Sequence, residues 1–311
     1  MITDGVRISG WSNVSGRRRT EIRLGLLFFL PAFVLLCGLL LWPCLQIIWL
    51  SFTKTNLLRP DRTGVFTGID NYLWLYRHSE FWISVSRSLV LTVFTTVVSI
   101  GLSYMIAVLL NRDFRGRPLI YVALFLPWVI SDVITAFIFR WNYDMTYGIV
   151  NYVLVDTLHI LSTPVSWLGT SETAMPAVVV ALVWRFMPFS TLVILAAMKQ
   201  VPDALIDAAR IDGTSPLALH TRVIIPSIKA PLVILTTLRI GAIFRSFDLT
   251  WLLTKGGPGD ATDILPIYYY RMAFEGMEVG KGAAVAVHIF AFVFLVYYMI
   301  YCFFGKEAFS R

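Results

Sequence analysis

The stretch that decides the fold is VPDALIDAARIDGTSPLALHTRVIIP, which runs from Val201 to Pro226. It is polar and helix-forming, yet it lies between two strongly apolar blocks at 174–198 and 230–254. A chain that only has to reverse direction between two membrane spans does so in a few residues. The stretch therefore predicts a structured module, and such a module is suited to dock something outside the membrane.

The first half of this module is predicted to be a helix. Pro202 suits a first helical turn, where its missing N–H is not needed, and Asp203 favours the positive end of the helix. Residues 203–212 are good or acceptable helix formers. Gly213 follows where a left-handed stop is wanted, so we expect a sharp turn there.

The second half predicts another helix. Ser215 and Pro216 suit its cap and first residue, and Pro226 is expected to end it. On the first helix, Ala208 and Ala209 would leave a face that a partner can approach closely. The alternative is an amphipathic hairpin that lies on the lipid headgroups.

The composition indicates an integral membrane protein. The chain is 57% hydrophobic and 14% charged, whereas a soluble domain is about a quarter charged. Each crossing needs about 20 apolar residues, and six such blocks are present, with five as the alternative because Thr, Ser and Arg87 dilute the second block. The predicted spans are 24–50, 83–110, 118–141, 174–198, 230–254 and 283–304.

The distribution of Lys and Arg predicts the orientation of the spans. With both termini inside, the cytoplasmic segments hold twice as many Lys and Arg residues as the outer loops. This assignment gives a transmembrane domain at 24–304, cytoplasmic tails at 1–23 and 305–311, and a cytoplasmic module at about 199–229. Each basic cluster flanks a span, so nucleic-acid binding is not expected.

The centre of the module carries a recognisable pattern. Asp207, Ala208 and Ala209 are followed by Asp212-Gly213-Thr214-Ser215 and later by Ile225-Pro226. This run resembles the "EAA" loop of the membrane permease subunits of ABC importers, which is the coupling helix that fits a cleft in the cytoplasmic ATPase subunit. The resemblance implies an ATPase-coupling role for Asp207, Ala208, Ala209, Asp212, Gly213, Thr214, Ser215 and Pro216.

The module departs from the family pattern at four positions. Asp207 replaces Glu, Thr214 replaces Ala, His220 replaces an aromatic residue and Ile225 replaces Leu. The shorter acidic side chain at 207 implies that the ion pair with the ATPase is made differently here.

The resemblance extends over most of the chain beyond about residue 25. It includes GIDNY at 68–72, NRDFRG at 111–116, WRFMPF at 184–189 and LTKGGPG at 253–259. These segments resemble the maltose-type (MalF-like) branch of binding-protein-dependent carbohydrate permeases. The implied fold is the all-α type I ABC importer permease fold, with six transmembrane helices and a cytoplasmic helix-turn-helix coupling loop.

The same resemblance implies the partners. They are a second permease subunit, with a heterodimer expected, two ATPase subunits, and a periplasmic or lipid-anchored substrate-binding protein, in a bacterial inner membrane. The chain contains no GxxxxGK[ST] phosphate loop, so ATP and Mg are expected on the partner ATPase. No cofactor, metal site or enzymatic activity is expected for this chain.

Charged residues inside the predicted spans are candidates for the substrate pathway, because such charges usually face a cavity or a partner. Arg245 and Asp248 are three residues apart, which predicts a shared helix face and a mutual ion pair. Arg185 is expected to bond a carbonyl or an Asp on a neighbouring helix, and His288 to be a packing residue. The full candidate set is Trp128, Asp132, Arg140, Asn142, Tyr143, Trp184, Arg185, Arg245, Asp248 and His288.

Two questions stay open on the sequence. The substrate is a neutral sugar, or an anionic one that the arginines within the spans would bind. A different class of protein, an ion- or proton-coupled carrier, would use Asp132, Asp248 and His288 as relays. Such a carrier needs no cytoplasmic docking hairpin and usually contains inverted repeats, which the sequence does not show.

Overall fold

The computed structural model describes residues 24–25, 27–59 and 63–305, which are mostly helical. Within these ranges the only sheet is a pair of short antiparallel strands, β1 (Thr53–Lys54) and β2 (Val65–Phe66). The all-α prediction is therefore confirmed for the described residues. The predicted tails 1–23 and 305–311 lie outside them, apart from Gly305.

Four helices are long and apolar enough to cross a membrane: Leu27–Ser51, α4 (Ser79–Leu110), α8 (Ser171–Met198) and α15 (Val279–Ile300, continuing to Phe304). The first of them contains a π-helical turn, η1 (Cys37–Leu41), followed by α2 (Trp42–Ser51). The other helical elements are α3 (Asp70–Arg77), α5 (Arg117–Val129), α6 (Asp132–Asn142), α7 (Ile149–Asn151), η3 (Tyr152–Thr157), α9 (Asp203–Ile211), α10 (Pro216–Leu219), η4 (His220–Ile224), α11 (Ile225–Ser227), α12 (Lys229–Phe244), α13 (Asp248–Thr254), α14 (Leu265–Tyr270), η5 (Arg271–Glu275) and η6 (Tyr301–Gly305).

The predicted span at 118–141 consists of two helices with a sharp bend between them. α5 and α6 are bent by 105° relative to each other. Ile130 is extended, and the side chain of Ser131 caps α6 by accepting a hydrogen bond from the N–H of Ile134 at 3.4 Å. The Ser131 cap stabilises the start of a new helix at this point. Hydropathy alone does not report such a break between two helices.

The predicted span at 230–254 is also interrupted. α12 ends at Phe244 and α13 begins at Asp248, where the carboxylate favours a helix N-terminus. α12 instead forms the second bent pair with Pro216–Ser227, at 76°. Counted by length and composition, the described residues offer four to six crossings, and the two bends decide the number.

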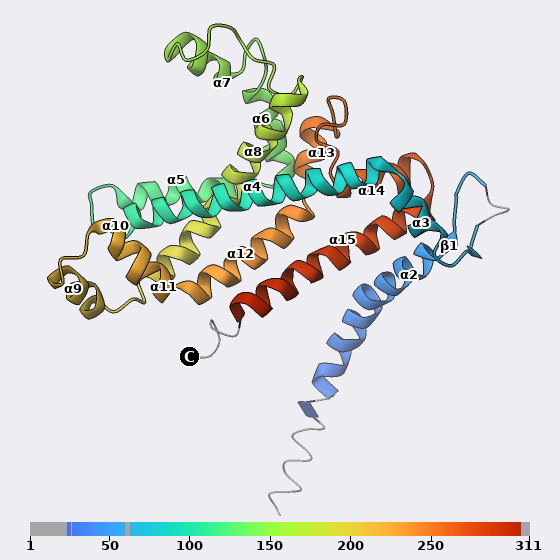
Figure 1. The fold of residues 1–311 in the computed structure, drawn as a ribbon, viewed down its shortest axis with the longest axis horizontal. Helices are drawn as coiled ribbons and strands as arrows, with labels where there is room; N and C mark the ends of the chain where they lie inside the picture. Colours follow the sequence, from blue (N-terminus) through green and yellow to red (C-terminus); the bar gives the residue numbers. More distant parts are fainter. Residues whose placement is uncertain (1–23, 26, 60–62, 306–311) are drawn as a thin grey trace, which may run out of the picture.

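The polar residues that dilute the second predicted span form the buried face of α4. This helix packs along α8 in the middle of the bundle (Figure 1). Small hydroxyl side chains let helices approach closely in a membrane, so these residues are suited to the packing of α4 against its neighbours. The buried hydroxyl residues of α4 are Ser84, Ser88, Thr92, Thr95, Thr96, Ser99 and Ser103.

The two ends of the bundle differ. The loop at 111–116, the module at 199–229 and the last turns of α15 gather at one end, which we call the module end (Figure 1). The strands, α3 and the loop at 255–264 lie toward the other end, which we call the opposite end. The segments predicted to share the cytoplasmic side, as far as the structure describes them, thus lie at one end of the molecule.

Candidate functional site

The module is a helix, a glycine turn and a second helix, as predicted. Pro202 is the extended residue that precedes α9, and Asp203 lies in the first turn of that helix. Gly213 has a φ of +73°, a conformation that a residue with a Cβ rarely adopts. The side chain of Ser215 then caps α10 by accepting a hydrogen bond from the N–H of Ala218 at 3.4 Å.

The second helix does not end at Pro226, contrary to the prediction. α10, η4 and α11 form one helical run, in which Pro226 lies near the start of α11 and Ser227 is the last residue. The π-helical turn η4 ends at Ile224, two residues before the proline. Such π turns and prolines often occur together where the regular hydrogen-bond ladder is interrupted.

The exposed face of the module differs from the predicted one. Ala208 is exposed, but Ala209 is buried and cannot contact a partner. Asp207 forms a 3.1 Å ion pair with Arg210, with both side chains exposed, and such a surface pair contributes little stability.

The most exposed large apolar side chains of the module are Ile211 and Leu217. Ile211 is 85% exposed and Leu217 is 76% exposed. They lie on the two sides of the Gly213 turn, and the module carries charged residues near them, which include Asp207 and Asp212. Sequence reasoning missed Ile211 and Leu217, although an apolar residue on each side of a polar glycine turn is a usable signal of a docking face.

A second candidate region lies at the bend between α5 and α6. Arg185 on α8 forms a 2.7 Å salt bridge with Asp132, the first residue of α6. Its guanidinium also donates to the backbone carbonyls of Trp128, at 3.0 Å, and Pro127, at 3.4 Å. Arg185 thus satisfies carbonyls at the end of α5 and a carboxylate at the start of α6, and the prediction of an interhelical bond is confirmed.

Aromatic and cationic side chains stack beside this bend. The ring of Trp128 stacks on Phe189 with 5.8 Å between centroids, and the indole is 46% exposed. Arg239 on α12 is buried, with its guanidinium 4.8 Å from the Phe186 ring and 2.9 Å from the hydroxyl of Ser190. We call Trp128, Asp132, Arg185, Phe186, Phe189 and Arg239 the bend site.

Four other candidates lie outside the bend site. The hydroxyl of Tyr143 is buried and donates to the Ala177 carbonyl at 3.0 Å, which makes it a core residue. Trp184 packs edge-on against Phe139 in the same core cluster. Asn142 is half-buried at the end of α6. Arg140 is exposed and lines a cavity of about 540 Å³ with Trp141 and other residues.

The predicted ion pair between Arg245 and Asp248 is absent from the described residues. The two residues do not share a helix, because Arg245 follows the end of α12 and Asp248 begins α13. Arg245 donates instead to the Gly241 carbonyl at 2.9 Å. It lines a cavity of about 530 Å³ together with aromatic residues that include Phe247 and Tyr270.

His288 is a packing residue, as predicted. Its Nε2 lies 2.8 Å from the hydroxyl of Tyr76, and its Nδ1 lies 2.8 Å from the Ala284 carbonyl. The rings of Tyr72 and Phe81 also contact it. Within the described residues no hydrogen bond or ion pair connects Asp132, Asp248 and His288, so the relay of a proton-coupled carrier is not assembled.

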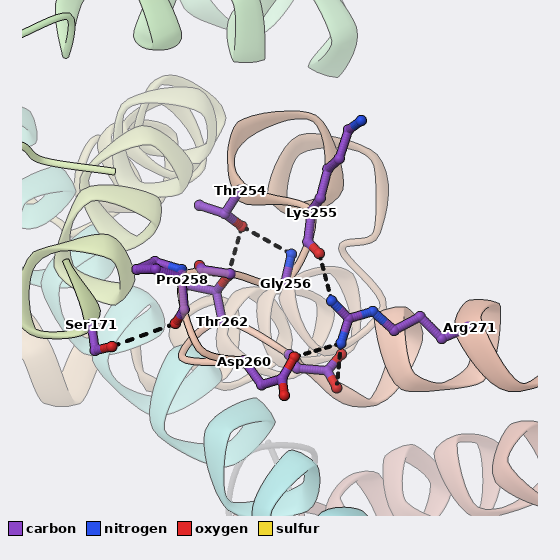
Figure 2. A network of polar contacts seen from close by, with 10 residues as sticks. Ser171, Thr254, Lys255, Gly256, Pro258, Asp260, Thr262 and Arg271 are labelled. Atoms are coloured by element: carbon purple, nitrogen blue, oxygen red, sulfur yellow. Dashed lines mark hydrogen bonds and ion pairs between the residues drawn. The ribbon is translucent and has the colours of Figure 1, made fainter. Parts of the chain in front are cut away.

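The glycine-rich segment after α13 is a turn, and a polar network holds it (Figure 2). Gly256 has a φ of +87°, and its lack of a Cβ lets the Arg271 guanidinium approach the loop. Arg271 donates to the Lys255 carbonyl at 2.9 Å and forms salt bridges with Asp260 at 2.7 Å and Asp263 at 3.3 Å. We call this arrangement the loop network.

Asp263 is the unusual member of the loop network. Its side chain is 8% exposed, and its Oδ1 has no hydrogen-bond partner. Burial raises the pKa of this carboxyl to about 6, although the positive charge of Arg271 opposes the shift. Neither Asp263 nor Arg271 was among the candidate residues predicted from the sequence.

Comparisons with known proteins agree on one family. The family model described as "Binding-protein-dependent transport system inner membrane component" matches residues 99–306. The chain is 32% identical to the trehalose/maltose transport system permease protein MalF of Thermococcus litoralis over 88% of its own length and 90% of the relative's. It is 31% identical to the trehalose transport system permease protein SugA of Mycobacterium tuberculosis, over 94% and 92%.

A solved structure shares the fold. It is the crystal structure of a bacterial ABC transporter involved in the import of the acidic polysaccharide alginate. The TM-score is 0.79 at 21% identity, and the match covers 95% of this chain and all of the other. The type I importer permease fold expected from the sequence is therefore the fold of this chain.

Proposed function

Because this chain belongs to the family of binding-protein-dependent transport system inner membrane components, we propose that it forms half of the translocation pathway of an ATP-driven importer. The family is a transport component, so the chain is a permease and not an enzyme. The proposed substrate is a sugar or a sugar derivative, which a binding protein delivers. The observation that carries the proposal is the exposed docking module at one end of a helical bundle that is interrupted by a polar bend.

The bend site is the proposed contact for the sugar. Sugars are bound by aromatic faces together with planar polar groups, and Trp128 offers an exposed indole next to the partly exposed carboxylate of Asp132. At the 105° bend, the extended residues Ile130 and Ser131 interrupt the helix. Irregular backbone at membrane depth is tolerated where it lines a cavity or is buried in protein, which supports a pathway here.

The charges of the bend site support a neutral sugar over an anionic one. Asp132 neutralises Arg185, and the aromatic ring of Phe186 covers the guanidinium of Arg239. Neither guanidinium is then readily available to an anionic substrate, because one is paired with a carboxylate and the other is buried against an aromatic ring. Arg140 and Arg245 each line a separate cavity and remain the candidates should the substrate be acidic.

The proposed assembly contains this chain, a second permease subunit, two ATPase subunits and a binding protein. ATP and Mg would bind to the ATPase; the described part of this chain contains no group of His, Cys, Asp or Glu residues that could hold a metal ion. Ile211 and Leu217 would enter the ATPase surface, with Asp207 and Asp212 beside them. In this arrangement the module and both termini face the cytoplasm.

Affinity purification tests the assembly. The tagged chain is purified from detergent-solubilised membranes, and co-purifying proteins are identified by mass spectrometry. We expect a second permease and an ATPase that contains a phosphate loop. Recovery of the chain alone, intact and monodisperse, would contradict the proposal and favour an ion-coupled carrier with an interfacial hairpin.

Uptake measurements test the substrate class. The purified complex is reconstituted in vesicles and supplied with trehalose, maltose and an alginate oligosaccharide, each with MgATP and the co-purified binding protein. We expect uptake of a neutral sugar that falls at least tenfold in Trp128→Ala and is unchanged in Arg140→Gln. Uptake of the acidic sugar alone, lost in Arg140→Gln, would reverse the assignment.

A further inference from the structure

The module contacts the bundle through a polar bond in addition to its chain connections to α8 and α12. The hydroxyl of Tyr104 on α4 lies 2.9 Å from Nδ1 of His220 in η4. The two rings also meet edge to face, with 5.8 Å between centroids and an interplanar angle of 83°. The Tyr104 side chain thus holds the second helix of the module against α4 by a directional contact.

The surroundings of this bond are mostly apolar. Ala107 and Leu110 of α4 form a buried cluster with Ile224 and Ile228 at the end of the module, and Tyr104 packs against that cluster. A hydrogen bond in such a place is electrostatically stronger than one in water. The contact is therefore directional and partly shielded from water.

The charge state of His220 fits an acceptor role. Burial, with a further contribution from the positive charge of Arg112, lowers the pKa of the imidazole below its ordinary value. The ring is then neutral at pH 7, and its Nδ1 can accept the hydrogen bond that the Tyr104 hydroxyl donates.

α4 carries this contact toward the opposite end of the molecule. The hydroxyl of Ser103, next to Tyr104, donates to the Met187 carbonyl on α8 at 3.0 Å. Further along α4, the hydroxyl of Ser88 accepts a buried hydrogen bond from the N–H of Leu265 at 2.7 Å. A rise of 1.5 Å per residue puts Tyr104 and Ser88 about 24 Å apart along the helix, so α4 links the module with the segment that directly follows Asp263.

We infer that the Tyr104–His220 hydrogen bond is the joint through which movement of the module reaches α4 and the loop network. The inference rests on the proposed function, in which the ATPase moves the module. His220 is then a positioning residue, and it occupies one of the positions where this chain departs from the coupling-loop pattern. Coupling between distant sites requires a structural element whose conformational equilibrium depends on both sites, and α4 is that element here.

Hydrogen exchange of the assembled complex, with and without MgATP, tests the joint. In the wild type, MgATP is expected to change amide exchange both in the module and at residues 262–266. In Tyr104→Phe the module still responds, but the response at 262–266 falls about two- to tenfold, the factor that corresponds to the loss of one net hydrogen bond. Tyr121→Phe is the matched control, because Tyr121 packs on the same cluster while its hydroxyl bonds Arg117 rather than the module.

Substitutions of His220 separate the hydrogen bond from simple packing. His220→Asn keeps a polar group near the position of Nδ1 and should retain the response at 262–266. His220→Gln moves that group, His220→Phe removes it, and both should lose the response. These variants give the same comparison if Tyr104→Phe does not assemble.

The outcomes distinguish this inference from the proposed function. A wild-type response at 262–266 in both Tyr104→Phe and His220→Phe would overturn the joint and leave the importer intact. The absence of any nucleotide response at 262–266 in a wild-type complex that hydrolyses ATP would overturn it as well. A wild-type preparation that contains no ATPase would contradict the proposed function itself.

Discussion

Within the described residues, two pairs of apolar helices meet at a sharp bend, and different forces hold the two bends. At the 105° bend between α5 and α6, Arg185 from a third helix bonds the carbonyls of one helix and the carboxylate of the next. At the 76° bend before α12, Ile224 and Ile228 pack into an apolar cluster. The first bend depends on one charged side chain, and the second depends on shape and buried area.

This difference has a functional consequence. A bend held by a few polar groups presents carboxylate, guanidinium and aromatic surface to a ligand, which suits a pathway. A bend held by apolar packing behaves as a rigid corner, which suits the transmission of force from the module. The first two of the following substitutions each remove the support of one bend, and the other two alter the module turn and the loop network.

Arg185→Met should have the largest effect on stability. It leaves the partly exposed Asp132 carboxylate and two carbonyls at the end of α5 without their partner, and the loss of three hydrogen bonds to a charged group costs about 3 kcal/mol or more. The midpoint of thermal unfolding of the purified chain should fall, and Asp132→Asn in the same chain should recover part of the loss. Arg140→Met, at an exposed arginine on α6, should change stability by less than about 0.5 kcal/mol; equal losses in the two variants would contradict the account of the polar bend.

Ile228→Ala should have the next largest effect. Ile228 is 2% exposed at the apolar corner, and an Ile-to-Ala change in a core costs about 2 kcal/mol or more through lost burial and a cavity. Ile211→Ala, at an exposed isoleucine in the same module, is the control and should unfold at the wild-type temperature. A stable Ile228→Ala variant would show that the corner is not held by packing.

Gly213→Val should cost about 1–2 kcal/mol, because a β-branched residue is strained at the left-handed φ of this turn. Gly213→Asn, which tolerates that conformation, should lie between valine and the wild type. The expected functional result for Gly213→Val is ATP hydrolysis uncoupled from uptake in an inserted chain. Normal uptake per ATP in the valine variant would contradict the role of the turn.

Asp263→Asn should have the smallest effect, and the effect should depend on pH. The folded-state pKa of about 6 lies above the ordinary value of 3.8, so the folded chain binds the proton more tightly than the unfolded chain. The stability that this proton confers is complete below about pH 3.8 and is lost as the pH rises through about 6. Melting temperatures at pH 4.5 and 7.5 should differ less in Asp263→Asn than in the wild type; an unchanged difference would contradict the burial of this carboxyl.

The sequence predicted a break between the module and the span from 230, close to the observed corner, and it missed the bend between α5 and α6 for a physical reason. The corner before α12 follows a module whose signals are local: a cap at Ser215, a glycine at 213 and a change from polar to apolar residues. The bend between α5 and α6 lies within continuous apolar sequence, where only Ser131 and Asp132 hint at a new helix. Its stabilising partner, Arg185, lies on another helix, and no local pattern reports such a contact.

The candidate site follows the same rule. The coupling residues lie in one contiguous segment and could be identified together, although local spacing gave no sign that Ala209 is buried. The pathway candidates come from several helices, so the sequence could name Asp132 and Arg185 but could only anticipate, not demonstrate, that they meet. The predicted pair of Arg245 and Asp248 failed because it assumed a continuous helix where the chain starts a new one.

The most direct test of the central claim is the amount of ATPase that co-purifies with Ile211→Asp/Leu217→Asp. Both side chains are exposed, so the variant should fold, insert and retain the second permease. We predict that the double variant loses most of its ATPase. Ile160→Asp, at an exposed isoleucine away from the module, should retain the ATPase. Wild-type recovery of ATPase with the double variant would contradict the assignment of this module as the docking unit.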